Sequence, residues 1–359
     1  AWLLFRVATW HTREGSSDTA RDLFDEAAST LLAADRKEAA ACLLLEQGRL
    51  LATGNRFEHA VRALELSLGH WQAVSADGLG VAATRFELGQ LARSRADLQA
   101  AEAHYRESLR LRQQLAPASL ETAASLNYLG ITIRRRAGPG DFDTAEEHHL
   151  EALAIQENVA PGSLDVATTF NSLGNVELLR GDLEAARSHY RSALAIREQL
   201  APGSLRHAAT LDNLAMIAQR QGDKAHAEEI FKDVLELREA QAPDSLAVAM
   251  SLNKIGTVAI ERGDFATAES YLQRALEMRR RLAPGSDEVA VTLNNLGEAA
   301  LFRGEVEVAR GYYDEALGIR EAGRPGTLSL GWSLRTAGRL SFLDGDLNAA
   351  RANFERARE

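Results

Sequence analysis

The sequence predicts an all-α protein in which pairs of helices stack into a solenoid, and three observations carry this prediction. Helix-favouring Ala, Leu, Glu and Arg dominate the 359 residues, whereas strand-type runs of β-branched and aromatic residues are missing. A proline recurs in steps of 44, 41, 41, 41 and 41 residues, at Pro117, Pro161, Pro202, Pro243, Pro284 and Pro325. Two further series share the 41-residue period, one at Gly140, Gly181, Gly222, Gly263, Gly304 and Gly345, and the other, with a single step of 44 between Gly130 and Gly174, at Gly48, Gly89, Gly130, Gly174, Ala215, Gly256, Gly297 and Gly338. Periods of this length are typical of repeat architectures.

Each repeat indicates two helices, which we call helix A and helix B, joined by short turns. A hydroxyl residue shortly after the proline suits the N-cap of helix A, as at Ser119, Ser163, Ser204, Ser245, Ser286 and Thr327. The Gly-Asp pair predicts the turn, because Gly can adopt the left-handed C′ conformation and Asp can start helix B. Helix B has small-aromatic-small spacing, as at Ala186, Tyr190 and Ala193, and ends at the next proline.

Helix B starts near residues 15, 55, 96, 140, 181, 222, 263, 304 and 345, which predicts about nine helix pairs. We expect a single solenoid over residues 1–359, with degenerate repeats in 1–114, regular repeats in 115–344 and a truncated repeat in 345–359. The extra residues of the long repeat lie in segment 134–140, which includes Pro139 and is either a hinge or a longer turn. Both ends of the chain lie mid-helix without the polar caps that solenoids need, so we expect a piece of a larger protein.

Composition excludes several classes of function. A net charge of −10 argues against nucleic acid, because phosphate binding needs a clustered positive surface. The arginine runs 134–136 and 279–281 are expected to be solvated helix ends, where cations complement the helix dipole. The single cysteine, Cys42, excludes an internal disulfide framework and fits a reducing, cytoplasmic compartment. The apolar opening AWLLFRVATW is interrupted by Arg6, which argues against a membrane span.

The repeat resembles the tetratricopeptide repeat (TPR) at Leu173, Gly174, Gly181, Ala186, Tyr190, Ala193 and Pro202. The 41-residue period and the segments LNNLG and ALAIRE are similar to the long, kinesin-light-chain-like type. Such repeats also resemble those beside caspase-like CHAT protease domains or nucleotide-dependent switch domains in bacterial multidomain proteins. The resemblance implies a right-handed superhelix in which helix A lines the concave groove.

A polar stripe runs along helix A and is the candidate partner-binding surface. Its first position, three residues before the small residue, holds Asn127, Asn171, Asp212, Asn253, Asn294 and Arg335. Its second position, the next residue, holds Tyr128, Ser172, Asn213, Lys254, Asn295 and Thr336. Its third position, one turn later, holds Ile131, Asn175, Met216, Thr257, Glu298 and Arg339, and the stripe extends to Gln90, Arg93 and Arg134.

Two interpretations of this stripe stay open. Asn is a mediocre helix former, so its recurrence in mid-helix is not explained by local propensity. In the resembled family the amides face the groove, where they can hydrogen-bond an extended peptide. The alternative is that they bridge adjacent repeats, Asn to Asn, and stiffen the stack. Under the first interpretation, replacing Asn171 and Asn253 by Ala weakens partner binding without changing stability.

Apparent catalytic motifs have structural explanations. The segment GLGVAA at 78–83 mimics a dinucleotide loop, but no strand precedes it, so we expect the start of a helix A. His104, His148 and His189 share one helix-B position with Tyr271 and Tyr312, which indicates packing or surface. The neighbours His148 and His149 point in different directions and make a poor metal pair. Cys42 is expected to be buried. We therefore predict no catalytic residue, no cofactor and no metal.

The sequence thus predicts a non-catalytic protein-interaction scaffold that binds a partner peptide or protein domain in its concave groove. We expect no nucleic acid, no membrane and no small-molecule substrate as partner. The alternative is the regulatory or sensor arm of a larger bacterial enzyme, such as a CHAT protease or a nucleotide-dependent switch, whose effector domain would occupy the groove. A third possibility is an assembly scaffold that self-associates through its helix-B surface.

Overall fold

The computed structural model describes Leu4, Arg6, Val7, Thr9 and residues 17–54, 56–138, 140–323, 328–343 and 345–358. Pro139, Pro325 and Thr327 lie outside these residues. The described part is helical and contains no strand, which confirms the all-α prediction. The chain divides into two compact units, residues 1–196 and 197–359, which are described separately.

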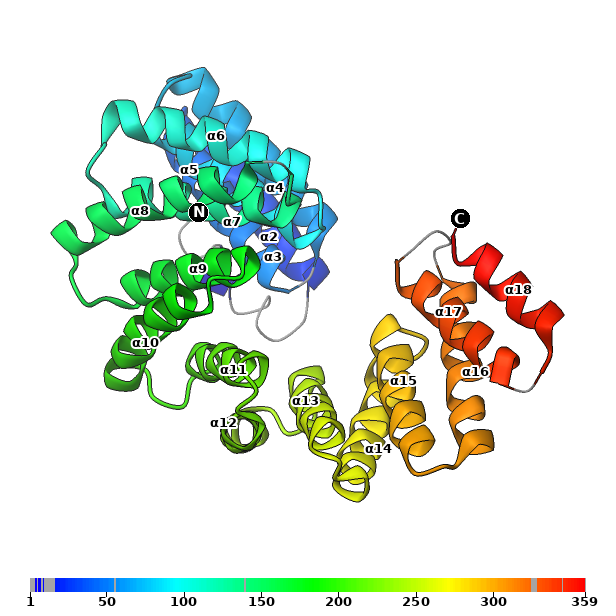
Figure 1. Cartoon of the computed structure of the whole chain (residues 1–359). Coiled ribbons are helices and arrows are strands. Elements are labelled where there is room, and N and C mark those ends of the chain that lie inside the picture. Colours follow the sequence, from blue (N-terminus) through cyan, green and yellow to red (C-terminus); the bar gives the residue numbers. More distant parts are fainter. Residues whose placement is uncertain are drawn as a thin grey trace. The chain divides into compact units, whose positions relative to one another are not determined.

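The helices alternate between A and B along the chain (Figure 1). The first unit comprises α2 (Ser17–Ala33), α3 (Lys37–Thr53), α4 (Phe57–Val74), α5 (Leu79–Ser94), α6 (Leu98–Leu115), α7 (Leu120–Arg136), α8 (Asp141–Val159), α9 (Leu164–Arg180) and most of α10 (Leu183–Leu200). The second comprises the end of α10 with α11 (Leu205–Arg220), α12 (Lys224–Gln241), α13 (Leu246–Arg262), α14 (Phe265–Leu282), α15 (Asp287–Phe302), α16 (Val306–Ala322), α17 (Leu328–Leu343) and α18 (Leu347–Arg356). Odd-numbered helices from α3 are A helices and even-numbered helices are B helices, so the predicted alternation is confirmed.

The predicted capping residues lie where the helices begin and end. Ser119, Ser163, Ser204 and Ser245 each cap a helix A by accepting a backbone N–H bond three residues on. Ser286 stands at the N-cap of α15 in an extended conformation, but its side chain accepts no such bond. Gly181 has φ of 89° at the C-cap of α9, a left-handed conformation that favours glycine. The segment 78–83 starts α5 at Leu79, so it is a helix start as expected.

Within a pair, the small residues permit close approach. A Cβ on Gly174 would lie 2.6 Å from Cε1 of Tyr190, which is shorter than a van der Waals contact. Tyr190, Ala186 and Leu173 are 0%, 0% and 1% exposed, so the aromatic ring fills the space that glycine leaves. Glycine at this position is therefore a packing requirement, as the repeat pattern predicts.

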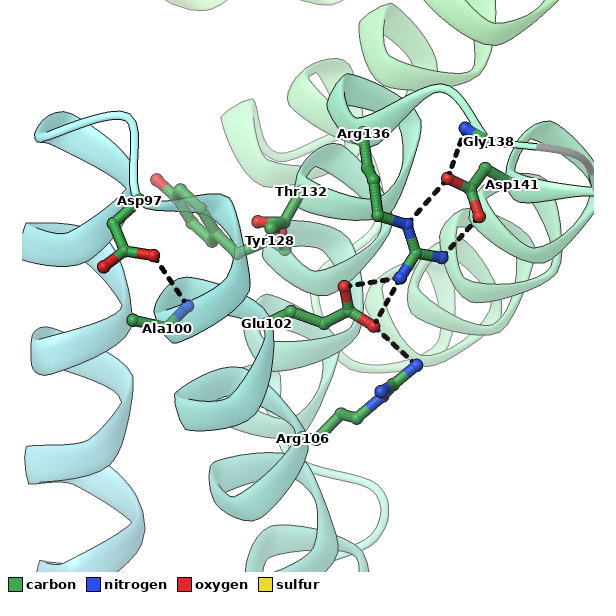
Figure 2. Close-up of polar contacts among 9 residues, drawn as sticks. All are labelled: Asp97, Ala100, Glu102, Arg106, Tyr128, Thr132, Arg136, Gly138 and Asp141. Atoms are coloured by element: carbon green, nitrogen blue, oxygen red, sulfur yellow. Dashed lines mark hydrogen bonds and ion pairs between the residues drawn. The ribbon is translucent and has the colours of Figure 1, made fainter.

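In the long repeat, ionic contacts join the end of α7 to the start of α8 (Figure 2). The guanidinium of Arg136 donates to both carboxylate oxygens of Asp141, at 2.9 and 2.5 Å, and to Glu102 of α6 at 3.0 Å. Asp141 also accepts from the backbone N–H of Gly138 at 2.7 Å. Chiefly because of the Arg136 hydrogen bonds, the pKa of Asp141 falls to about 2. Arg136 at the end of α7 and Asp141 at the start of α8 are thus joined by an ion pair.

Candidate functional site

The first position of the polar stripe is mostly buried. Asn127, Asp212 and Asn294 are only 3%, 4% and 4% exposed, Asn171 and Asn253 are half-buried, and Arg335 is exposed. These side chains come from the middle of their A helices. A partner lying on the surface would reach the buried members only after the neighbouring helices moved.

Asp212 of α11 lies in a buried ionic network. One carboxylate oxygen is 2.5 Å from Nη2 of Arg238 on α12, and the other is 3.1 Å from Nζ of Lys254 on α13. Arg238 also donates to Oγ of Ser251 on α13 at 2.6 Å. Lys254 lies 5.4 Å from the ring of Phe231, a cation–π contact. The network therefore joins one helix pair to the next.

The same arrangement recurs one repeat later with amides. Oδ1 of Asn253 on α13 accepts from Nδ2 of Asn295 on α15 at 3.2 Å, and a guanidinium nitrogen of Arg279 lies 3.5 Å away. Arg279 also donates to Oγ1 of Thr292 at 2.5 Å and to the carbonyl oxygen of Glu288 at 2.8 Å. Asn-to-Asn bridging between adjacent repeats, one of the two interpretations of the stripe, thus occurs at this junction.

A buried arginine near the end of helix B is the feature that sequence reasoning missed. It is 4–7% exposed and recurs at Arg112, Arg197, Arg238, Arg279 and Arg320. Thirteen residues later a hydroxyl accepts its hydrogen bond, at Ser125, Thr210, Ser251, Thr292 and Ser333. Burial lowers the pKa of Arg112 and of Arg197 to about 10. The 41-residue recurrence of both residue types was visible in the sequence.

The burial of these arginines corrects the interpretation of the arginine runs. Both runs do lie at helix ends: the first ends α7 at Arg136, and the second lies in the last turn of α14, which ends at Leu282. Arg279, however, is only 6% exposed and Arg134 is half-buried, so these two are not solvated. Burial lowers the pKa of both groups.

Most side chains at the second position of the stripe are more exposed than those at the first, and several contact other residues of the fold. Tyr128 is half-buried and packs against the rings of Phe86 and Tyr105, at centroid distances of 5.3 and 5.9 Å. The guanidinium of Arg93 lies 5.3 Å from the Tyr128 ring. Asn213, Lys254 and Asn295 are also half-buried, whereas Ser172 is buried.

The third position contains the most accessible members of the stripe. Gln90 donates to Glu87 at 3.0 Å, and Asn175 accepts from the hydroxyl of Tyr190 at 2.9 Å. Glu298 and Arg339 are exposed, as is Arg335 of the first position. In the described part of the chain these three side chains form no hydrogen bond or ion pair.

Glu298 and Arg339 lie near the same buried ring. Burial raises the pKa of the Tyr313 phenol to about 12; the negative charge of Glu298 adds to this shift and the positive charge of Arg339 opposes it. Partial burial, followed by repulsion from Glu261, raises the pKa of Glu298 itself. The end of the stripe on α15 and α17 therefore presents opposite charges that the described fold leaves unpaired.

The described residues form no metal centre and no membrane-spanning helix, and one cysteine differs from expectation. No group of three His, Cys, Asp or Glu side chains there is arranged to hold a metal ion. No described helix is long and apolar enough to cross a membrane. Cys42 of α3 is exposed, so the expectation of a buried thiol is wrong.

Comparisons with known proteins agree with the architecture. A family model of the tetratricopeptide repeat matches residues 121–199, 165–240, 206–281, 245–322 and 288–359. The chain belongs to the tetratricopeptide repeat family. The TPR matches together cover more than half of the chain, from residue 121 to its last residue. No curated protein matches the chain.

Several solved structures are similar to this TPR protein. The apo form of the quorum sensor NprR from B. thuringiensis is 12% identical, with a TM-score of 0.69 over 99% of this chain and 96% of that one. A Rap protein complexed with competence and sporulation factor is 14% identical, with a TM-score of 0.63 over 99% and 96% of the two chains. A putative kinesin light chain of Podosopora anserina is 16% identical, with a TM-score of 0.48 over 58% and 99%. At such identities the first two likenesses show the fold, an all-α solenoid of TPR type.

Proposed function

We propose that this TPR protein is a non-catalytic scaffold that binds a partner peptide or protein domain along its A helices. The observation that carries the proposal is the unpaired charge at Glu298, Arg335 and Arg339 on α15 and α17. Charged side chains fixed on rigid helices, with no partner in the described fold, are suited to electrostatic recognition. Both signs are present, so the proposed partner segment carries both acidic and basic residues.

Stripe residues that are paired within the fold serve this surface indirectly. Asp212 and Asn253, with their arginine and lysine or asparagine partners, hold neighbouring A helices at a fixed spacing. The half-buried Asn171, Asn175, Asn213 and Lys254, with Gln90, Arg93, Tyr128 and Arg134, are proposed to contact the partner at their accessible edges. We place the protein in the cytoplasm, because a single exposed thiol fits a reducing compartment.

The test is a charge reversal at the accessible end of the stripe. The variant combines Glu298→Lys, Arg335→Glu and Arg339→Glu, and its matched control combines Glu307→Lys and Arg351→Glu on the B helices α16 and α18, whose side chains are 85% and 80% exposed. Partners captured by the wild-type chain from its source organism are identified, purified and titrated by calorimetry against all three proteins. We expect the stripe variant to weaken the affinity at least about tenfold, as loss of close charge pairs does, and the control to change it little.

Melting curves accompany the titration, because all five substitutions are at exposed positions and should leave stability nearly unchanged. Equal affinity of wild type, stripe variant and control would contradict the proposal and would place recognition on another surface.

A further inference from the structure

A pocket of about 310 Å³ opens between α2, α3 and α4, away from the polar stripe. Its walls are mixed: Leu32 from α2, Leu44 and Leu51 from α3, and Leu66 from α4 supply apolar surface, whereas Asp25 and Ser29 of α2 and His70 of α4 supply polar groups. Arg62 and His59 of α4 stand exposed at its margin. The volume is at the lower end of the range in which proteins bind small ligands.

The floor of the pocket carries a buried polar group. Gln47 is 3% exposed and lines the pocket, and its Oε1 atom accepts no hydrogen bond from any described residue. A buried acceptor without a hydrogen-bond partner is energetically costly. The corresponding position in the other repeats, directly before the small residue of helix A, holds Leu88, Leu129, Leu173, Leu214, Ile255, Leu296 and Ala337. Gln47 therefore places a hydrogen-bond acceptor where the repeat otherwise has an apolar side chain.

Two small residues create the space above Gln47. Ala63 on α4 occupies the position that His104, His148 and His189 occupy in later B helices. Ala28 on α2 occupies the position of Leu109 on α6, four residues after the buried aromatic ring. Both alanines line the pocket. Between α6 and α8 the equivalent groove contains Leu109, Leu129 and His148 instead, so its floor is apolar and a ring occupies its wall.

We propose that this pocket binds a neutral aromatic group with a single N–H donor, such as an indole, whose N–H donates to Oε1 of Gln47. The four leucines offer apolar surface to a ring, and the unsatisfied Oε1 of Gln47 favours a ligand with one donor at its buried end. The site is separate from the stripe and independent of the proposed partner.

The test titrates the full chain with indole and with 1-methylindole, which has a similar shape but no N–H donor. Binding is followed by ligand-observed saturation-transfer NMR. We expect indole to bind about tenfold more tightly than 1-methylindole, since a hydrogen bond to a buried acceptor accounts for that ratio. N-acetyltryptophanamide is the third probe: its binding identifies a tryptophan side chain as an acceptable source of the indole, and its exclusion identifies a free small molecule.

Two variants locate the site. Gln47→Leu introduces the residue of other repeats, so the chain should fold, and the preference for indole over 1-methylindole should vanish. Ala63→His fills the wall as in the neighbouring grooves and should weaken both probes about tenfold or more. Equal affinity of the two probes for the wild-type chain, no binding of indole at millimolar concentration, or unchanged discrimination in Gln47→Leu would overturn the proposal and leave water as the partner of Gln47.

Discussion

The regular repeats of α11–α15 and the long repeat of α7–α8 solve the same packing problem with different chemistry. In the regular repeats Arg238 and Arg279 link a helix-A residue of their own pair, Asp212 or Asn253, to the next helix A. In the long repeat Gln156 occupies the arginine position and accepts from the hydroxyl of Thr169 at 2.7 Å. An amide cannot supply the same fork of donors as a guanidinium.

The consequence appears at Asn127, the stripe residue of the long repeat. Its Oδ1 atom is buried and accepts no hydrogen bond from the described residues. Asn294, whose neighbouring Arg320 contacts Asp287 and Ser333, is likewise left without a partner at Oδ1 in the described fold. The same stripe position is therefore an inter-repeat link where an arginine reaches it and an unsatisfied amide where none does.

The largest expected effect breaks the arginine link in the regular repeats. Arg238→Met keeps most of the apolar stem but leaves the 5% exposed carboxylate of Asp212 with Lys254 alone. Removing one partner of a buried ion pair costs about 3–5 kcal/mol, so we expect a loss of this size in the free energy of unfolding. Urea denaturation measures it, and hydrogen exchange should show the loss concentrated in α11–α13.

Arg274→Met is the control, because Arg274 and its partner Glu239 have side chains 53% and 39% exposed. An exposed pair contributes about 0–1 kcal/mol, so this variant should hardly change stability. If Arg238→Met were no more destabilising than Arg274→Met, the buried arginine would not be what joins the repeats.

A smaller, pH-dependent effect is expected in the long repeat. His149 occupies the buried position that Tyr105, Tyr190 and Tyr313 fill elsewhere; it is 0% exposed, and neither ring nitrogen has a hydrogen-bond partner among the described residues. Burial first, then the charge of Arg134 and the neighbouring His148, lowers its pKa to about 3. An unfolded histidine has a pKa near 6.5, so below that pH the unfolded chain binds a proton that the folded chain does not.

His149 should therefore reduce stability as the pH falls from about 6.5 towards 3, by about 1.4 kcal/mol per pH unit and about 2 kcal/mol at pH 5. His149→Tyr restores the residue of other repeats and should flatten the stability profile between pH 7 and 5. His226→Gln, at a side chain 57% exposed, is the matched control and should leave the slope unchanged. Identical slopes for wild type and His149→Tyr would show that His149 takes up a proton within the fold.

The fold was predictable because its determinants are local and repeated. Ser119 and Gly181 act within one turn of a helix end, and the Gly174–Tyr190 contact joins the two helices of one repeat; the sequence presents each of these features several times. The burial of Asp212 was harder to predict, because its partner Arg238 lies 26 residues away and looks in the sequence like a solvated arginine at a helix end. Polar side chains on helix A were expected to face a groove, but pairing with a cation allows Asp212 to be buried. The exposure of Cys42 was not predicted, because the pattern of the degenerate first repeats does not show clearly which face of the helix is buried.

The smallest expected effect separates two regular repeats that the sequence presents as alike. Ser204 caps α11 by accepting the backbone N–H of His207 at 3.2 Å, whereas the hydroxyl of Ser286 has no partner among the described residues. Ser204→Ala should therefore cost about 1 kcal/mol, as loss of an N-cap bond does, and Ser286→Ala only a few tenths. Asp287 and Glu288 in the first turn of α15 complement the helix dipole there and make its cap less necessary. Urea denaturation of the two single variants decides the matter: equal losses would mean that Ser286 caps α15 in solution and that the two repeats start in the same way.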